Sequence, residues 1–503
     1  MKKFPAFFLS LISFLLLLPL PVFAQENFSV ASTVTYSISE NGTTHVSFSS
    51  ILTNQASEYS ALSYKIRVGF FDIKNLKAHD SNGKINPEII EEDDEKTIKL
   101  PFNKPVTGKN NSISFSLSFD TRDVASRQGE IWEINIPGLS SRNEFSGFDV
   151  IVKVPSSFGE PAYVKPEISN ASQQKDGSLY FPKDILKKSG ISIAYGKNQV
   201  YYFNLKYHLK NSNLFPVKKE IALPPSTNYQ EVFVEKIEPK PLKIITDKDG
   251  NSLAQFYLLP FEKKDISVAG NAKIFLNPKK QILSDDQRKE YLKEKLYWET
   301  SNEFIKKLAK KLKTPKAIYD YVVATLTYDY SRVAEKKPRL GAAQALQTPS
   351  SAVCLEFTDL FIALARAASI PAREVDGFAY SNSSKQRPLS LVNDVLNAWP
   401  EYYDDNLKTW VMIDPTWENT TGGIDYFNTF DFDHFAFVIK GLNSSYPVPP
   451  GGNKDIQVSF AKKKLVLTNK DNATKIQANG LLITVIFIIA AGAGSILFFR
   501  QKG

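Results

Sequence analysis

The sequence has few of the residues from which disulfides and metal sites are made. Cys354 is the only cysteine among 503 residues, so no disulfide can form within the chain. Histidines do not cluster, because His45, His79 and His208 are scattered singly through strand-like sequence. No acidic cluster has the spacing of a calcium-binding EF-hand loop. We therefore expect no metal ion and no other cofactor.

The two ends of the chain predict export and anchoring. Lys2 and Lys3, the apolar run Phe7–Leu20 and a small-residue pattern ending at Ala24 predict a signal peptide over residues 1–24. The uncharged run Leu481–Phe499 is long enough to cross a hydrocarbon core at about 1.5 Å per residue. It predicts a transmembrane helix over residues 480–499.

Charge predicts the orientation of that helix and the kind of surface the chain meets. Arg500 and Lys502 favour a cytoplasmic tail over residues 500–503, with the large N-terminal part outside the cytoplasm. The net charge of +9 is spread through lysines, which favours anionic surfaces such as lipid headgroups or wall polymers. An exported chain has no nucleic acid to bind. The oligomeric state is not fixed by the sequence.

Alternating apolar and polar residues predict two β-rich modules. Val34, Tyr36 and Ile38 precede Asn41-Gly42, and such a pair between alternating segments is the strongest short hairpin signal. The alternation recurs as far as Leu209, and no long helical period occurs before about residue 265. We predict β-sandwich modules over residues 25–130 and 131–265, with a boundary near residue 130.

Helix-start signals appear from Ser284 onward. The capping-box pattern occurs at Ser284 and again at Thr300, and Thr314 precedes a proline at a first helical position. We predict a helical linker over residues 266–299, an α+β domain over residues 300–445 and a stalk over residues 446–479. The fold class is therefore multi-domain, with all-β modules, one α+β domain and a C-terminal transmembrane helix.

Cys354 begins a predicted buried helix. Phe357, Leu360, Phe361 and Leu364 recur at helical spacing after it. The unpaired amide N–H groups and the positive end of the helix dipole favour the thiolate form of a cysteine in the first turn. This position is typical of a nucleophilic cysteine. The alternative is a small buried hydrophobic residue without a chemical role.

A hairpin that follows this helix predicts a second pair of site residues. Its strands flank the polar stretch from Asp404 to Asn406. If the turn centres on residues 405 and 406, Asn397 lies directly opposite Asp414, with Cβ atoms about 5 Å apart on one face. We therefore predict that Asn397 and Asp414 are neighbours and that the preceding helix presents Cys354 to them.

The motifs between Ala317 and Trp417 resemble the transglutaminase-like domain of the papain-fold thiol enzymes. They are Tyr328-Asp329, Cys354-Leu355-Glu356, Arg366-Ala367, Ile370-Pro371-Ala372-Arg373, Gly377, Ala398-Trp399 and Asp414-Pro415-Thr416-Trp417. The resemblance implies that Cys354 is the nucleophile and Asp414 the orienting aspartate. The family's histidine precedes Ala-Trp, and this position is Asn397. An amide does not titrate in the useful range, so Asn397 cannot act as a base.

Three interpretations of the function follow. The favoured one is a degenerate domain whose Cys354, Asn397 and Asp414 form a relic site, and which binds peptide or protein chains at the cell envelope or serves as a structural part. The second is an active peptidase or transamidase in which another group supplies the base. His434 is the nearby histidine in sequence, and its alternative role is that of a strand-end residue. The third is an adhesion or assembly protein that acts through its β modules.

Overall fold

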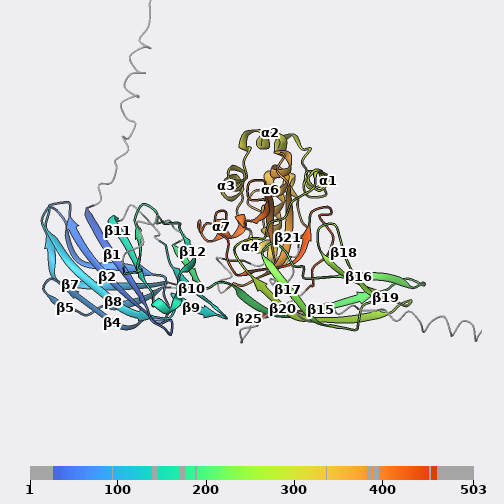
Figure 1. Ribbon diagram of the computed structural model, residues 1–503. Helices are drawn as coiled ribbons and strands as arrows, with labels where there is room; N and C mark the ends of the chain where they lie inside the picture. The colour runs from blue at the N-terminus through green and yellow to red at the C-terminus, as the bar shows by residue number, and fades with distance from the viewer. Residues whose placement is uncertain are drawn as a thin grey trace, which may run out of the picture. The chain divides into compact units, whose positions relative to one another are not determined.

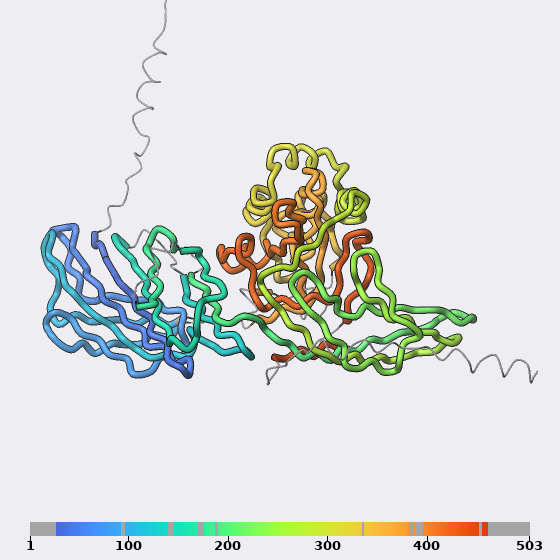
Figure 2. Tube along the Cα trace, viewed as in Figure 1, coloured from blue at the N-terminus to red at the C-terminus, as the bar shows by residue number. Residues whose placement is uncertain are grey.

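The computed structural model describes residues 27–460, except 93–94, 139–144, 169–175, 187–189, 336, 382–386, 389–395 and 452–454. Figures 1 and 2 show β-rich regions and one mixed helical and β region. No helix within the described ranges has both the length and the apolar character needed to cross a bilayer. The predicted signal peptide and the predicted span Leu481–Phe499 lie outside the described residues, so both stay predictions.

The N-terminal module is built from three sheets. A seven-stranded sheet has the order β13-β11-β1-β2-β8-β4-β5, a four-stranded sheet the order β12-β14-β10-β9, and a three-stranded sheet the order β3-β7-β6. The strands are β1 (Phe28–Ile38), β2 (Thr44–Asn54), β3 (Ser60–Val68), β4 (Lys74–Asp80), β5 (Gly83–Ile85), β6 (Glu88–Glu92), β7 (Glu95–Thr107), β8 (Ser112–Thr121), β9 (Ala125–Gln128), β10 (Ile131–Ile136), β11 (Phe145–Lys153), β12 (Pro161–Lys165), β13 (Leu179–Pro182) and β14 (Ile191–Tyr195), with a short 3₁₀ helix at Ser156–Phe158. The predicted hairpin at Asn41-Gly42 joins β1 to β2 and is confirmed.

One hydrophobic core joins the strands on both sides of residue 130. Phe119 packs in the same core as Phe148 and Ile193. β11 pairs in parallel with β1, so the chain returns to its first sheet after residue 130. The predicted boundary near residue 130 is therefore wrong. Alternation marks each strand, but it does not tell which strands share a sheet.

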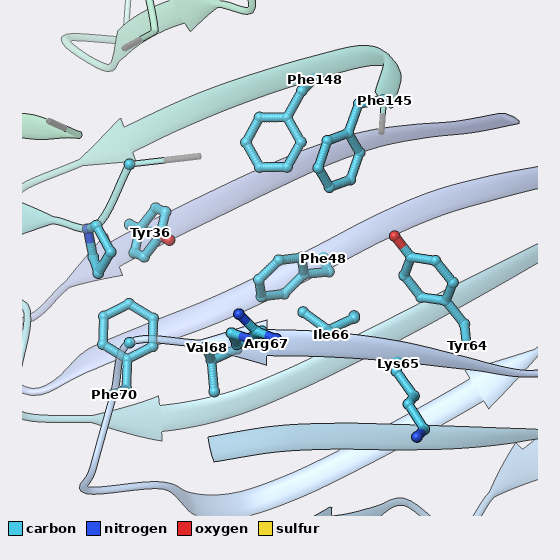
Figure 3. A pocket seen from close by; sticks show the side chains of 13 residues that line it. Tyr36, Phe48, Tyr64, Lys65, Ile66, Arg67, Val68, Phe70, Phe145 and Phe148 are labelled. Atoms are coloured by element: carbon cyan, nitrogen blue, oxygen red, sulfur yellow. The ribbon is translucent and has the colours of Figure 1, made fainter. Parts of the chain in front are cut away.

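A small hollow lies inside this module. Its volume is about 140 Å³, and aromatic rings from several strands line it, among them Tyr36, Phe48 and Phe148 (Figure 3). Lys65 and Arg67 add cationic side chains to the lining. None of the predicted site residues lies here.

The second β module packs two sheets together, in the orders β17-β20-β15-β25 and β16-β19-β18. The strands are β15 (Gln199–Lys210), β16 (Val217–Leu223), β17 (Gln230–Glu238), β18 (Lys243–Thr246), β19 (Ser252–Leu258), β20 (Lys263–Ile274) and β25 (Ile456–Phe460). Residues 266–274 are thus strand rather than the start of a helical linker. β25 pairs with β15, so part of the predicted stalk belongs to this module. Both corrections depend on pairing between segments that are distant in sequence.

The helices precede and surround the Cys354 region. They are α1 (Asp285–Glu290), α2 (Glu303–Leu312), α3 (Pro315–Thr325), α4 (Tyr330–Glu335), α5 (Ala342–Gln347), α6 (Cys354–Ala367) and α7 (Pro415–Thr420). The predicted caps at Ser284 and Thr314 are confirmed. The predicted cap at Thr300 is wrong, because the Asn302 side chain accepts hydrogen bonds from the first turn of α2 instead. Asn is as good a cap as Ser or Thr.

A four-stranded sheet of order β23-β22-β21-β24 lies against α6. Its strands are β21 (Ala372–Ala379), β22 (Leu396–Asp404), β23 (Thr409–Met412) and β24 (His434–Lys440). β24 is an edge strand, yet its outer backbone groups are paired. The Gln230 amide bonds both backbone groups of Ala436 at 2.8–2.9 Å, and Asn251 does the same for Ile439 at 2.7 Å. The second β module therefore closes the open edge of this sheet.

Candidate active site

Cys354 is the first residue of α6 and is fully buried. The Glu356 carboxylate accepts a hydrogen bond from the Val353 backbone N–H at 2.9 Å and so ties the start of the helix. The same carboxylate lies 3.2 Å from the Arg332 guanidinium. The predicted position of the cysteine in the first turn of a buried helix is confirmed. The Glu356 carboxylate, itself paired with Arg332, holds the backbone at the start of this helix.

The first turns of α6 face strand β22 beside Asn397. The Thr358 hydroxyl, one turn after Cys354, donates to the Ala398 carbonyl oxygen at 3.2 Å. Ala398 is the neighbour of Asn397 in sequence. Packing of α6 on β22 thus brings the cysteine end of the helix to the strand that carries Asn397.

The predicted pair of Asn397 and Asp414 is present. The Asn397 amide Nδ2 donates to Asp414 Oδ2 at 2.9 Å, and both side chains are fully buried. The predicted register is wrong by two residues, because Glu401 pairs with Met412. A shift of two keeps every side chain on its face of the strand, which is why the pair still meets. Asp414 follows the end of β23 and caps α7, where its Oδ1 accepts from the Trp417 N–H at 3.0 Å.

His434 joins this pair from the edge strand β24, two strands away from β22. Its Nε2 lies 3.2 Å from Asp414 Oδ2, and its Nδ1 lies 2.7 Å from Asp431 Oδ1. Between β22 and β24 runs β21, where Gly377 pairs with Asn397. A Cβ at Gly377 would lie 2.1 Å from the Phe435 carbonyl oxygen. Glycine therefore lets β24 approach closely enough for His434 to reach Asp414.

Aromatic rings surround His434 apart from its two carboxylates and the Asn397 amide, whose Nδ2 lies 3.5 Å from His434 Nε2. Its ring lies 4.5–4.9 Å, between centroids, from the rings of Trp399, Trp417 and Phe430. Burial would lower the pKa of His434, but the Asp431 and Asp414 carboxylates outweigh it and hold that pKa above its ordinary value. Burial likewise opposes the charge on Asp431, yet His434 lowers the pKa of that carboxyl. The two carboxylates therefore favour the protonated form of the ring more than burial disfavours it.

Asp431 is the functional-site residue that sequence reasoning missed. It lies three residues before His434, and this spacing is the only local signal for it. Further charges lie around it: the Arg387 guanidinium is 3.4 Å from the Asp433 carboxylate. The Lys165 ammonium of the N-terminal module lies 3.8 Å from the centre of the Tyr426 ring, and burial lowers the pKa of Lys165 to about 8. These contacts come from segments far apart in sequence.

One other histidine also lies between two carboxylates: His208 Nδ1 is 2.6 Å from Asp265 Oδ1 and its Nε2 is 3.1 Å from Asp455 Oδ1, but this group is open to solvent. His45, His79 and His208 are exposed. No group of three or more His, Cys, Asp or Glu residues in the described part of the chain is placed to hold a metal ion. A hollow of about 530 Å³ lies among α2, α3 and α5, lined by Phe304, Leu308, Tyr321 and other residues, but by none of the site residues.

Comparison with known proteins agrees with this arrangement over part of the chain. Residues 299–415 match the model of the transglutaminase-like superfamily. His434 lies beyond the matched segment. No curated protein matches the chain.

Solved structures with some likeness include a candidate cysteine protease from Cytophaga hutchinsonii, at 16% identity and a TM-score of 0.34, covering 53% of this chain and 99% of that one. The periplasmic domain of TgpA from Pseudomonas aeruginosa, bound to ethylmercury, has 15% identity and a TM-score of 0.24, covering 44% and 91%. Residues 299–415 are identified as a transglutaminase-like domain by the matched family model. The buried helix that begins at Cys354 and the pair of Asn397 and Asp414 agree with this match.

Proposed function

We propose that this chain is an envelope-anchored extracytoplasmic protein whose transglutaminase-like domain has lost acyl transfer and binds peptide or protein chains or serves as a structural part. One observation supports the proposed loss of catalysis. Asp414 accepts a hydrogen bond from the Asn397 amide, at the position where the family has its histidine. The anchor and the exported location rest on the predicted signal peptide and C-terminal helix.

Both carboxylate oxygens of Asp414 already have hydrogen-bond partners. Oδ1 caps α7, and Oδ2 is shared by Asn397 and His434. In a cysteine enzyme of this kind, the aspartate orients an imidazole that takes the thiol proton. Here the oriented group is an amide, which cannot take a proton near neutral pH. Loss of such a base costs about two to four powers of ten in rate.

His434 does not replace the missing base in this arrangement. Both its nitrogens face carboxylates, and these hold its pKa above the ordinary value. A general base must present an unprotonated nitrogen to the thiol, and the carboxylates beside both nitrogens favour the protonated form. In this proposal His434 is a counter-ion between Asp414 and Asp431.

Alkylation of the full chain tests the state of the thiol directly, because Cys354 is the only cysteine. We expect iodoacetamide to label native protein slowly at neutral pH and to label it fully once it is unfolded. Rapid labelling of native protein, lost in Cys354→Ser, would show an activated thiolate and contradict the proposal.

Exchanging the side chains of Asn397 and His434 tests whether the general base is the only group that the site lacks. The double variant Asn397→His/His434→Asn moves the imidazole to the family position and keeps one amide and one imidazole in the pocket. We expect Cys354-dependent release of ammonia or cleavage of a glutamine-containing peptide, about a hundredfold or more above the native chain. Asn406→His, on the exposed hairpin turn, controls for an added histidine. No gain in the double variant would mean that more than the base has been lost.

A second candidate is an active thiol enzyme that uses His434 as its base. The observation in its favour is the 3.2 Å contact between His434 Nε2 and Asp414. This candidate requires native Cys354-dependent turnover that disappears in His434→Asn. Native turnover that survives that substitution would exclude His434 as the base.

A further inference from the structure

Two neighbouring loops of the second β module expose large apolar side chains. Residues 211–216 join β15 to β16, and residues 259–262 join β19 to β20. We call four residues of these loops the apolar tip: they are Leu214, Phe215, Leu259 and Phe261, exposed by 82%, 63%, 59% and 62%. The hairpins that carry the loops extend beyond the helices (Figures 1 and 2). Clustered exposed apolar residues of this size mark a binding surface.

The two loops are fixed to each other by one buried side chain. Asn211 is fully buried, and its amide Nδ2 donates to the carbonyl oxygens of Phe215 at 2.9 Å and Leu259 at 2.8 Å. The backbone N–H of Asn211 donates to the Glu262 carbonyl oxygen at 2.9 Å. The fold therefore presents the apolar tip as one built surface.

Phe261 adopts a backbone conformation that folding alone does not favour for it. Its φ is 59°, in the left-handed region, where glycine or asparagine is the usual residue. A residue with a bulky side chain there costs about 1–2 kcal/mol. Because 62% of Phe261 is exposed, its packing within the chain offsets only part of this cost. An aromatic residue at this position indicates a partner outside the chain.

Lysines gather at the base of the apolar tip, and Glu262, the acidic residue of loop 259–262, is paired with Lys264 at 3.1 Å. Lys210 lies directly opposite Lys263 in the antiparallel pair of β15 and β20, and both are exposed. Like charges directly opposite each other destabilise a sheet. Lys218 and Lys219, also exposed, follow loop 211–216 on β16. An anionic partner would offset this repulsion.

We propose that the apolar tip inserts into the surface of an anionic phospholipid bilayer, with the surrounding lysines at the level of the headgroups. Apolar side chains with lysines beside them are the combination that binds at a membrane interface. Each lysine near an anionic surface adds about 1 kcal/mol. The insertion does not depend on whether the Cys354 site is active.

The length of chain after the second β module permits this contact. About 20 residues separate Phe460 from the predicted membrane helix at Leu481, and they span at most about 70 Å. Phe460 pairs with Tyr201, and the tip lies at the far end of β15, about 30 Å away. A chain anchored by that helix can therefore bring the tip to the same bilayer.

Fluorescent labels on the full-length chain test the insertion. In a Cys354→Ser background, an environment-sensitive dye is attached to Leu214→Cys or Phe261→Cys, and the chain is reconstituted into mixed phosphatidylcholine and phosphatidylglycerol vesicles. Ile51→Cys and Leu407→Cys, at positions exposed by 50% and 55%, are the controls. We expect nitroxide-labelled lipid to quench the tip labels about threefold or more beyond the controls, as for side chains in the acyl boundary.

The charge requirement is tested in the same system. Pure phosphatidylcholine vesicles, or Lys210→Gln/Lys263→Gln in mixed vesicles, should reduce the quenching of the tip labels about twofold or more, because the headgroup attraction is lost. Tip labels that are quenched no more than the controls would overturn the proposal. Self-quenching between tip labels without lipid quenching would also overturn it, because the tip would then contact a second copy of the chain.

Discussion

Two clusters of buried charge pack around α6, and they are balanced in different ways. We call the first the ion cluster: Arg339 bonds Asp359 and Glu374, while Lys440 contacts Glu374 and Asp376. The second is the site cluster of Asn397, Asp414, Asp431 and His434. Arg339 and Lys440 supply the cations of the ion cluster, whereas the site cluster has the imidazole of His434 between two carboxylates, with Lys165 and Arg387 farther out.

The two clusters differ in whether their main cation can lose its charge near neutral pH. Burial opposes the charge on Arg339, but Asp359 and Glu374 outweigh it and hold the pKa of Arg339 above its ordinary value. No pH near neutral changes that charge. The charge of His434 can change near neutral pH, because imidazole is the side chain that titrates there. The cation of the site cluster can therefore titrate near neutral pH, whereas in the ion cluster the carboxyls titrate there, because burial raises the pKa of Asp359 to about 8 and that of Asp376 to about 7.

The largest effect is expected from Arg339→Met. This substitution leaves Asp359 and Glu374 buried without their shared cation, and removal of one partner of a buried ion pair costs about 3–5 kcal/mol. Denaturant unfolding of the full chain measures the loss. The triple variant with Asp359→Asn and Glu374→Gln should recover part of it, because the orphaned charges are gone. A loss below about 1 kcal/mol in Arg339→Met would show that the cluster is not a stabilising pair.

A smaller effect, and one that depends on pH, is expected at His434. Its pKa is higher in the folded chain than in the unfolded chain, so its contribution is complete below the unfolded pKa and is lost as pH rises through the folded pKa. The stability difference between native chain and His434→Gln should therefore shrink between acidic and alkaline pH, by about 1.4 kcal/mol per unit of pKa shift. Unfolding measured across this range checks it. A difference that is constant with pH would show that His434 is neutral in the fold.

The smallest effect is expected outside both clusters. Arg288 and Asp405 form an ion pair in which Arg288 is 32% and Asp405 66% exposed. Solvent screens such a pair, so Arg288→Gln should cost less than about 1 kcal/mol. The same unfolding assay gives the comparison with Arg339→Met. A cost similar to that of Arg339→Met would remove the distinction between buried and exposed pairs in this chain.

Local sequence patterns predicted the elements and part of the site. Alternation placed the strands, and helical spacing placed Cys354 at the start of a buried helix. The pair of Asn397 and Asp414 followed from strand periodicity even though the register was shifted by two residues. These features depend on residues close together in the chain.

The module boundaries and the contacts of His434 and Asp431 were decided by pairing between segments that are distant in sequence. The return of β11 to β1 removed the boundary at residue 130, and β25 joined the second module across about 250 residues of chain. His434 reached Asp414 because Gly377 lets β24 approach, and Asp431 came with it. The sequence by itself thus determined which side chains the site contains on its helix and hairpin. Only the tertiary structure decided that the pKa of His434 is raised, because the burial of the imidazole and the carboxylates beside it arise from contacts that no local pattern records.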